Sequence, residues 1–271
     1  MMKAFLIVTS LVLLLPNFFR KDIIPFPAYN HLEDFDPSLS GIKSLDQLEE
    51  YVDKRAAANN ITPGSFEYVE LTESVVKQRF YHGFSHFSLN ENWVAALGGR
   101  FDEGLACKVK PEDILQHSNA ACSQQSIVMM ALLRKKHIDY RKVGFPHHYA
   151  MEVMIGKNWF FFDPDMEPTI SKDQRMETSW LLQGDSLKQY YNAAVHKDLD
   201  YQFGVGIKAT TGTVNEIPAA NIKIFHSLTA IASKLFWMLP LILLYFRPAV
   251  SFSPSFSLRI KRKQPKFSLA G

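Results

Sequence analysis

The sequence lacks the patterns that indicate a bound cofactor or metal. It has no glycine-rich phosphate loop and no cluster of cysteine and histidine at metal-ligand spacing, and its nine histidines are scattered along the chain. Nucleotide-binding loops depend on closely spaced glycines, and structural zinc sites depend on grouped cysteine and histidine ligands. We therefore expect no cofactor and no metal.

A strong excess of one charge is also missing. The formal net charge is +3, and residues 247–271 hold six basic and no acidic side chains, so the rest of the chain is slightly acidic. Nucleic-acid binding needs a basic surface that attracts phosphates, and the main part of the chain does not provide one. We expect no nucleic-acid partner. Residues 22–221 show no internal repeat and are enough for one domain with a sizeable core.

The sequence does contain a cysteine at the start of a predicted helix. Apolar residues recur with helical spacing up to about Arg134, which predicts a helix over residues 119–136. Ser118 or Asn119 can cap its first turn. Cys122 then lies where free N–H groups and the helix dipole favour a thiolate over a thiol. The alternative is a small thiol buried in the core.

Cysteine is otherwise scarce, since the only other one is Cys107. A disulfide between Cys107 and Cys122 is conceivable in an oxidising compartment. Because that bond would silence a nucleophile at Cys122, we expect Cys107 to be either a bystander or a redox partner.

A predicted hairpin follows the cysteine helix. Residues 149–155 and 159–162 alternate or cluster apolar residues in the manner of strands, and the segment between them, 156–158, is typical of a turn. His148 opens the first strand and Asp163 closes the second, so the hairpin brings them side by side. Asp163 can then accept a hydrogen bond from one ring nitrogen of His148, which leaves the other nitrogen for a thiol. Taken singly, each residue could equally be a polar group flanking a loop.

Four stretches carry a resemblance to a known family. They are Cys122, the run Ala131–Gly144, the pattern His148-x-x-x-Glu152-Val153 and the pattern Trp159-x-x-x-Asp163-Pro164. Together with the preceding Val109–Leu115, they resemble the transglutaminase-like branch of the papain-like cysteine enzymes. The resemblance covers residues 109–168, and the family usually has glycine where His137 stands.

This resemblance implies an α+β fold in which a cysteine-bearing helix packs on an antiparallel sheet. It implies Cys122 as the nucleophile, His148 as general base and acid, and Asp163 as the residue that orients the imidazole. His147 is an alternate base and Asp165 an alternate orienting carboxylate. We prefer His148 because it stands four residues before Glu152, as in the family. Neighbouring residues on a strand point to opposite faces, so only one of the two histidines can meet the thiol.

An oxyanion intermediate needs a hydrogen-bond donor, and the sequence offers two candidates. The backbone N–H of Cys122 lies at its helix start, and Gln116 stands six residues before it, a spacing that resembles the oxyanion glutamine of papain. Trp93 is either an aromatic wall of the site or, as the more ordinary interpretation, an anchor in a helix core.

Both ends of the chain are apolar enough to suggest membrane attachment. Residues 4–19 follow a charged start and lack a small-x-small cleavage site, so we expect residues 1–21 to form an uncleaved signal anchor. Residues 222–246 are predicted to form a transmembrane helix, although Lys234 near its middle is unfavourable for insertion. The alternatives for this second segment are a core helix or an interfacial helix.

The basic segment 247–271 sets the expected orientation. Cytoplasmic flanks of membrane helices are rich in lysine and arginine, so this tail is predicted to be cytoplasmic or to lie on anionic lipid. With two spans in the cytoplasmic membrane and both ends inside, the domain over residues 22–221 faces outward. Arg20 and Lys21 argue mildly against this orientation.

The remaining helices follow from caps and periodicity. Ser44 opens a predicted helix that ends near Ala58, and further helices are expected over residues 65–81, 90–96 and 173–197. A strand is expected over residues 139–145, and residues 198–221 are expected to be a polar connection.

The sequence as a whole predicts a membrane-anchored thiol enzyme. It would act on an amide bond of a peptide or protein by acyl transfer through a thioester on Cys122, as a peptidase or amidase if water takes the acyl group, or as a cross-linking enzyme if an amine does. The alternatives are a catalytically silent binding or scaffolding module, and a structural protein of an envelope or surface-polymer assembly.

Overall fold

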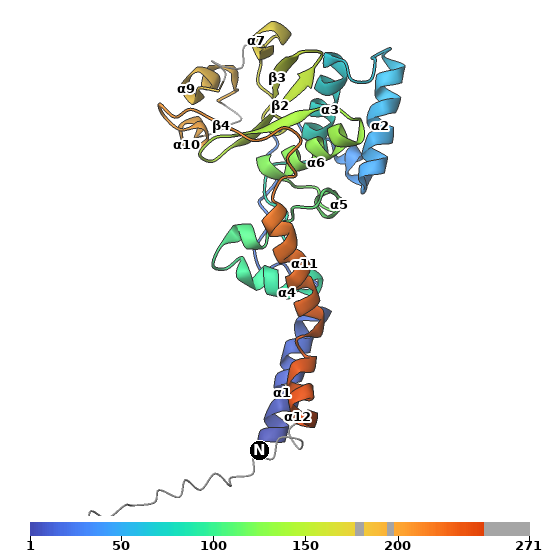
Figure 1. Cartoon of the computed structure of the whole chain (residues 1–271), viewed down its shortest axis with the longest axis vertical. Coiled ribbons are helices and arrows are strands. Elements are labelled where there is room, and N and C mark those ends of the chain that lie inside the picture. The colour runs from blue at the N-terminus through green and yellow to red at the C-terminus, as the bar shows by residue number, and fades with distance from the viewer. Residues whose placement is uncertain (177–181, 194–197, 247–271) are drawn as a thin grey trace, which may run out of the picture. The chain divides into compact units, whose positions relative to one another are not determined.

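The computed structural model describes residues 1–176, 182–193 and 198–246. It divides into two compact units, one formed by Met1–Leu15 with the segment from Leu235 onward, and one formed by Pro16–Lys234 (Figure 1). The larger unit extends beyond the predicted domain of residues 22–221 at both ends. The basic tail predicted for residues 247–271 lies outside the described residues.

A four-stranded antiparallel sheet forms the centre of the larger unit, in the order β3-β2-β1-β4. Its strands are β1 (Tyr140–Gly144), β2 (Tyr149–Ile155), β3 (Asn158–Phe162) and the short β4 (Thr210–Thr211). The hairpin of β2 and β3 turns at Gly156, whose φ of +66° lies in the left-handed region that glycine adopts without strain. Met151 pairs with Phe162 across this hairpin. The prediction of these two strands is confirmed.

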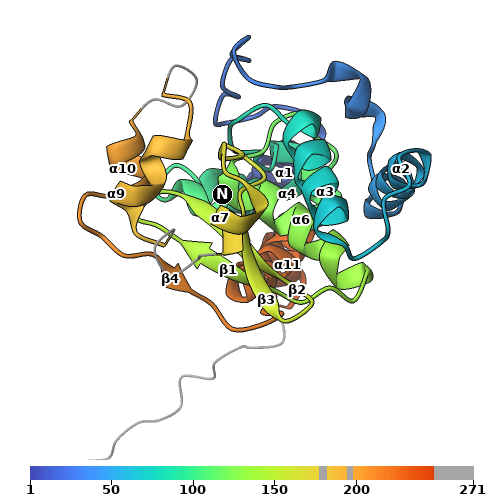
Figure 2. The same ribbon diagram turned by 90° about the horizontal axis from the view of Figure 1, so that it is seen from above.

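Helices cover the sheet on both sides, so apolar side chains from both faces of the strands are buried. On one side are α2 (Leu45–Ala58), α3 (Phe66–Arg79) and α6 (Cys122–Lys135), as Figure 2 shows. They share a large core with Met151, Val153, Phe160 and Phe162, which come from alternate positions of the strands.

The smaller core lies on the other face of the sheet. Ala150 and Phe161 pack there with residues of α9 (Gly184–Leu187) and α10 (Leu199–Phe203). The prediction of one helix over residues 173–197 is wrong in the described part. After α7 (Lys172–Met176), the backbone is extended at Gln183 and again at Tyr191, which flank α9 and the 3-10 turn η4 (Lys188–Tyr190). Residues 177–181 and 194–197 of that predicted helix lie outside the described residues.

Three helices of the predicted set begin at serine caps. The Ser44 hydroxyl accepts a hydrogen bond from Gln47 N at the start of α2, and the Ser65 hydroxyl accepts one from Tyr68 N at the start of α3. The Ser88 backbone and hydroxyl are held by Glu91 at the start of α4 (Leu89–Gly98). Each cap satisfies polar groups that a helix start leaves without partners.

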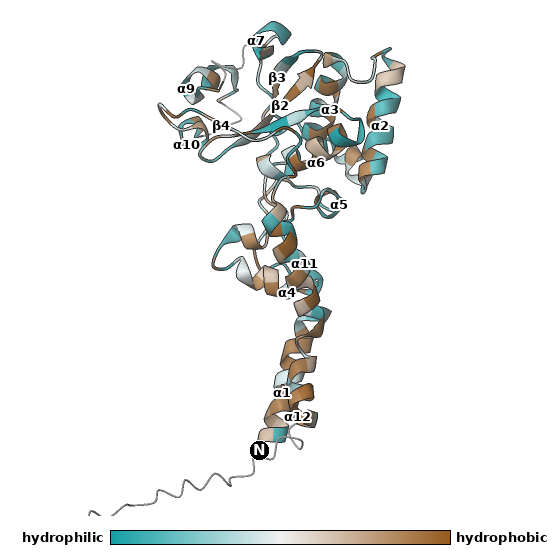
Figure 3. Ribbon diagram, in the orientation of Figure 1, coloured by the Kyte–Doolittle hydropathy of each residue, from teal (hydrophilic) through white to brown (hydrophobic). Residues whose placement is uncertain are grey.

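The predicted transmembrane helix over residues 222–246 is not continuous. It is divided into α11 (Ala220–Leu235) and α12 (Met238–Phe246), and the N-terminal segment forms α1 (Met2–Leu14) followed by the 3-10 turn η1 (Leu15–Phe18). Among the described residues, no single helix has the length and apolar character needed to cross a membrane, whereas α11 and α12 together, as a bent pair, meet that criterion by length and composition. Figure 3 shows the apolar colouring of α1 and α12.

Within the smaller unit, α1 and α12 lie side by side (Figure 1). The buried Ser10 hydroxyl of α1 donates a hydrogen bond to the carbonyl of Trp237, just before α12. Most other side chains of both helices are apolar and exposed, including Phe5, Leu11 and Leu243.

Candidate functional site

The first residue of α6 is Cys122 itself, three residues later than the predicted start. Asn119 does not cap this helix, because its side-chain amide donates to the carbonyls of Gly83 and Phe84. Since Cys122 is the first residue of α6, its N–H has no acceptor within the helix and points away from the helix at its N-terminal end. The half-buried thiol therefore stands at the positive end of the helix dipole.

Buried Gln124 fixes the start of α6 to the preceding segments. Its carbonyl oxygen accepts hydrogen bonds from Ser85 N at 2.9 Å and Ala121 N at 3.3 Å. Its amide group donates to the carbonyls of Ser85 at 2.9 Å and Lys108 at 2.7 Å. All four bonds are made in a side chain that is 1% exposed, so the position of the neighbouring thiol is firmly set.

The sheet brings His148 and Asp163 to this helix start. His148 directly precedes β2, Asp163 directly follows β3, and the Nε2 of His148 lies 2.6 Å from the Oδ2 of Asp163. The other ring nitrogen, Nδ1, is left for the thiol. One side-chain donor atom from each of Cys122, His148 and Asp165 lies within 4.8 Å of the other two. The structure thus brings together the sulfur, imidazole and carboxylate that the sequence singled out.

Asp163 is buried and yet remains ionised. Its Oδ2 also accepts a hydrogen bond from the Tyr191 hydroxyl at 2.7 Å, and its Oδ1 accepts bonds from the N–H groups of Asp165 and Met166 at 3.2 Å. Burial acts to raise the pKa of Asp163, but the charge and hydrogen bond of His148, together with these donors, hold it below its usual value.

The contact between His148 and Asp163 changes the pKa of His148 in the opposite direction, upward. Burial disfavours the imidazolium, but the carboxylate of Asp163 and the adjacent Cys122 raise the pKa of His148 well above its ordinary value. A protonated imidazole between a carboxylate and a thiol favours the thiolate–imidazolium pair. The arrangement suits nucleophilic attack by sulfur followed by proton donation from nitrogen.

Two further side chains reach the site without being predicted. His82 Nδ1 lies 3.0 Å from Asp165 Oδ1, and Gln125 Nε2 donates to the same oxygen at 2.6 Å. The Asp165 carboxylate raises the pKa of His82 to about 9, in spite of partial burial, and Cys122 contributes to the increase. His82 is therefore a second imidazolium beside the thiol at neutral pH.

The position of His82 results from a contact between segments far apart in sequence. Tyr81 N donates to Ser118 O at 3.0 Å, and Ala120 N donates to Tyr81 O at 3.1 Å. This isolated bridge aligns the chain before the cysteine helix with the chain after α3. No local pattern marks His82, so only the pairing of the two segments could have identified it.

The other predicted site residues lie elsewhere. Gln116 is exposed, and its amide donates to the carbonyls of Lys43 at 2.7 Å and Glu112 at 3.1 Å. These contacts do not support the predicted oxyanion role of its side chain. His147 is exposed and stacks on Tyr201 with ring centroids 3.8 Å apart. Both histidines precede β2, and of the two only His148 is buried at the site, so the alternate base His147 is exposed outside it.

Trp93 and Cys107 also have positions away from the thiol. The Trp93 ring is buried in α4, and its Nε1 donates to Ser233 O at 2.8 Å, which agrees with an anchor between helices. Both cysteines lie in the described part of the chain and are free thiols. Burial raises the pKa of Cys107 to about 12, so this thiol is a weak nucleophile, and its Sγ donates to Glu103 O at 3.3 Å.

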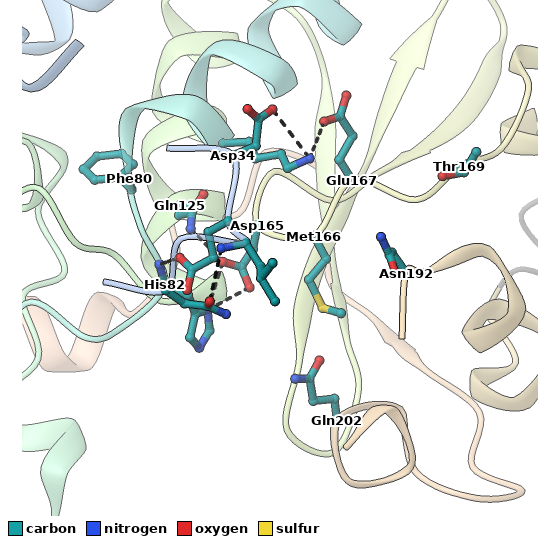
Figure 4. Close-up of a pocket in the computed structure, with 14 residues that line it drawn as sticks. Asp34, Phe80, His82, Gln125, Asp165, Met166, Glu167, Thr169, Asn192 and Gln202 are labelled. Atoms are coloured by element: carbon teal, nitrogen blue, oxygen red, sulfur yellow. Dashed lines mark hydrogen bonds and ion pairs between the residues drawn. The ribbon is translucent and has the colours of Figure 1, made fainter. Parts of the chain in front are cut away.

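A cavity of about 430 Å³ adjoins the site (Figure 4). His82, Gln125, Asp165 and Met166 are among its lining residues, and Asp165 also lies close to the Cys122 thiol. Its remaining lining is mostly polar and includes the ion pair of Lys77 with Glu167, whose Nζ–Oε2 distance is 2.9 Å.

The chain was compared with models of protein families, with curated proteins and with solved structures. None of the three comparisons found a match. The described geometry of Cys122, His148 and Asp163 is therefore the main basis for a functional assignment, beside the resemblance read from residues 109–168.

Proposed function

We propose that this protein is a thiol enzyme that acts on amide bonds by acyl transfer, with Cys122 as nucleophile, His148 as general base and acid, and Asp163 as the orienting carboxylate. The observation that carries the proposal is the 2.6 Å contact of His148 Nε2 with Asp163 Oδ2, with the second ring nitrogen left for the thiol at the start of α6. The substrate is a peptide or protein amide.

The proposed reaction begins with attack of the Cys122 thiolate on the amide carbonyl carbon. The backbone N–H of Cys122 is the donor available to the oxyanion that forms. His148 then gives its Nδ1 proton to the leaving nitrogen, the C–N bond breaks, and a thioester remains. Water or an amine next loses a proton to His148 and attacks the thioester, which releases an acid or a new amide.

Asp163 supports both halves of this cycle. Its hydrogen bond fixes the Nε2–H tautomer of His148 and stabilises the imidazolium after proton uptake. Tyr191 and two backbone N–H groups hold the carboxylate in place, so it keeps its orientation while the ring changes charge.

Two features support a transglutaminase-like core for residues 109–168. The helix that carries Cys122 packs on the antiparallel hairpin that carries His148 and Asp163. His137, just after this helix, has a φ of 56°, in the region that glycine adopts most easily. The family resemblance places glycine at this position, so the backbone here keeps the conformation although the residue differs.

We also propose that the protein is attached to the cytoplasmic membrane through its two apolar ends, with the larger unit facing outward and the basic tail in the cytoplasm. Support comes from α11, which exposes apolar side chains and buries polar ones, the reverse of a surface helix on a soluble protein. Its residues Ile224, Leu228 and Ile231 are 61%, 63% and 59% exposed. They lie on one helix face at spacings of four and three residues, and hydrocarbon is the medium in which such a face is stable.

The opposite face of α11 is polar and buried against α4. Asn92 Nδ2 donates to Thr229 Oγ1 at 2.9 Å, and the Ser233 hydroxyl donates to Asn92 Oδ1 at 2.9 Å and accepts from Val94 N at 3.0 Å. His226, on the same face, contacts Leu105 O at 2.9 Å through Nε2. Polar side chains that bond across helices while apolar ones face outward are typical of proteins in contact with lipid.

Labelling of the intact membrane protein with an activity-based thiol probe tests the proposed activity. We expect rapid labelling of Cys122 at pH 7, and about 30-fold slower labelling in His148→Ala, because an ordinary thiol is only a few per cent ionised at that pH. His147→Ala is the matched control and should label as the native protein does. Mass analysis of acyl groups trapped on Cys122 would then identify the substrate class.

Two results would contradict the proposal. One is a labelling rate for native Cys122 that increases with pH as the rate of a free thiol does. The other is an unchanged cellular phenotype in Cys122→Ala, which would favour a silent binding or scaffolding module.

A further inference from the structure

The thiol site contains Asp165, a donor that the proposed acyl transfer does not use and that lies beside two donors that it does use, Cys122 and His148. Cys122, His148 and Asp165 each offer one donor atom, and these three atoms lie within 4.8 Å of one another. Donors around a tetrahedral zinc ion lie about 3.3–3.8 Å apart, as bond lengths of about 2.0–2.3 Å require. Small side-chain adjustments would therefore bring all three into contact with one ion.

We propose that the site binds one Zn²⁺ ion through Cys122 Sγ, His148 Nδ1 and a carboxylate oxygen of Asp165, and that the bound ion blocks the thiol. Sulfur, nitrogen and oxygen donors in this combination suit zinc, whereas Mg²⁺ and Ca²⁺ prefer oxygen ligands alone. Cys122 is half-buried whereas the side chain of Asp165 is only 4% exposed, so a fourth ligand from solvent would approach from the side of the thiol.

Two of these three residues, His148 and Asp165, have hydrogen-bond partners of the kind that commonly orient metal ligands. Metal-binding histidines commonly donate their other ring nitrogen to a carboxylate, and His148 Nε2 is 2.6 Å from Asp163. Metal-binding carboxylates are commonly hydrogen-bonded as well, and Gln125 donates to Asp165 Oδ1 at 2.6 Å. His82 also contacts Asp165, at 3.0 Å from Oδ1 and 3.1 Å from Oδ2, so the ion would have to share this carboxylate.

Zinc binding and nucleophilic attack exclude each other at this site. The thiolate–imidazolium pair holds one proton, on His148 Nδ1. When the ion binds, this proton is released to solvent, and the sulfur and the nitrogen each donate a lone pair to the metal. No free thiolate remains to attack a carbonyl, and no proton remains for a leaving amine. The zinc-bound protein is the inhibited form.

Cobalt(II) provides a direct test with the full-length protein in detergent, after chelation of metal. A thiolate bound to Co²⁺ gives a charge-transfer absorption in the near ultraviolet. We expect this band to saturate at one equivalent of Co²⁺ and to disappear when Zn²⁺ displaces the cobalt. Cys122→Ser should lack the band, and Asp165→Asn should bind Zn²⁺ at least ~10-fold more weakly. Cys107→Ser and His147→Ala are the controls and should bind as the native protein does.

Iodoacetamide labelling separates this inference from the proposed function. If Zn²⁺ protects Cys122 and the Co²⁺ band forms, the metal site holds whether or not an amide is ever turned over. Absence of the band, or a band that persists in Cys122→Ser, would overturn it. Rapid labelling of Cys122 without protection by Zn²⁺ would remove the metal site and leave the thiol enzyme in place.

Discussion

Asp163 shows how single residues at this site depend on several partners at once. A carboxylate that is fully buried stays ionised only where donors surround it, and here the donors are His148, Tyr191 and two backbone N–H groups. Its backbone N–H is itself bonded to Glu73 at 2.6 Å, and Glu73 forms an ion pair with Arg175 at 3.0 Å. A buried network thus supports a single imidazole.

Asp163→Asn tests this dependence. The substitution removes the negative charge that raises the pKa of His148, so the imidazolium that the proposed mechanism needs becomes less populated at neutral pH. We expect alkylation of Cys122 at pH 7 to slow by about ten-fold or more, the range for loss of a close opposite charge. The exposed Asp185→Asn serves as control, and an equal slowing there would contradict the assigned role.

His82 gives a prediction for pH. Its pKa of about 9 in the folded chain is above the ordinary value of 6.5, so the pair with Asp165 stabilises the fold fully below pH 6.5. That stabilisation is lost as the pH rises from 6.5 toward 9. The His82 side chain is 52% exposed, so solvent screening reduces the effect.

We expect the free energy of unfolding of native protein to fall more between pH 6.5 and 9 than that of His82→Gln. Urea titrations at several pH values measure both. Parallel curves for the two proteins would show that the pair with Asp165 does not contribute.

At the scale of elements, the start of α6 is fixed by Gln124 rather than by a serine or asparagine cap. Gln124→Leu would leave its partners at Ser85, Ala121 and Lys108 without hydrogen bonds in a buried place. Each unsatisfied group costs about 1–3 kcal/mol, so we expect a loss of at least ~3 kcal/mol in the free energy of unfolding, with slower labelling of Cys122.

Exposed Gln116 is the matched control for Gln124. Gln116→Ala should change the free energy of unfolding by less than ~1 kcal/mol and leave the labelling rate unchanged, because its side chain is exposed and its amide bonds to the carbonyls of Lys43 and Glu112. A large loss of labelling in Gln116→Ala would instead restore the oxyanion role suggested by its spacing from Cys122.

The elements that could be predicted are those specified by local sequence. The strand pattern and Gly156 predict β2 and β3, and Ser44 predicts the start of α2, because these signals depend on residues close in the chain. The start of α6, the position of His82 and the extended residues Gln183 and Tyr191 within the predicted helix over residues 173–197 were missed. They depend on contacts such as the bridge of Tyr81 with Asn119, which no periodicity reveals.

The same distinction holds for the candidate site. His148 and Asp163 are close in sequence, and a hairpin brings them together by its own geometry. Gln125 and His82 are joined through Asp165, which lies after the hairpin. Spacing of Gln116 from Cys122 suggested a donor, but Gln116 follows α5 (Pro111–Ile114) and bonds to that short helix and to Lys43.

At the scale of the whole molecule, the proposed membrane attachment makes a prediction about topology. A reporter protein fused after residue 270 should be active only in the cytoplasm, since residues 247–271 carry six basic side chains and no acidic one. A reporter inserted in the exposed turn at Gly64 should be active on the outer side. The reverse pattern, or release of the protein by alkaline carbonate, would contradict two-span attachment.

The exposed apolar face of α11 has a consequence for any attempt to prepare the part of the chain that holds the thiol site on its own. A fragment cut at residue 219 would strip Asn92, Trp93 and Val94 of the partners that Thr229 and Ser233 provide. A fragment cut at residue 234 would retain them but would present three large aliphatic side chains to water. Cleavage at either position therefore does not give a stable soluble fragment, and the thiol site keeps its support from α4 only while α11 remains attached.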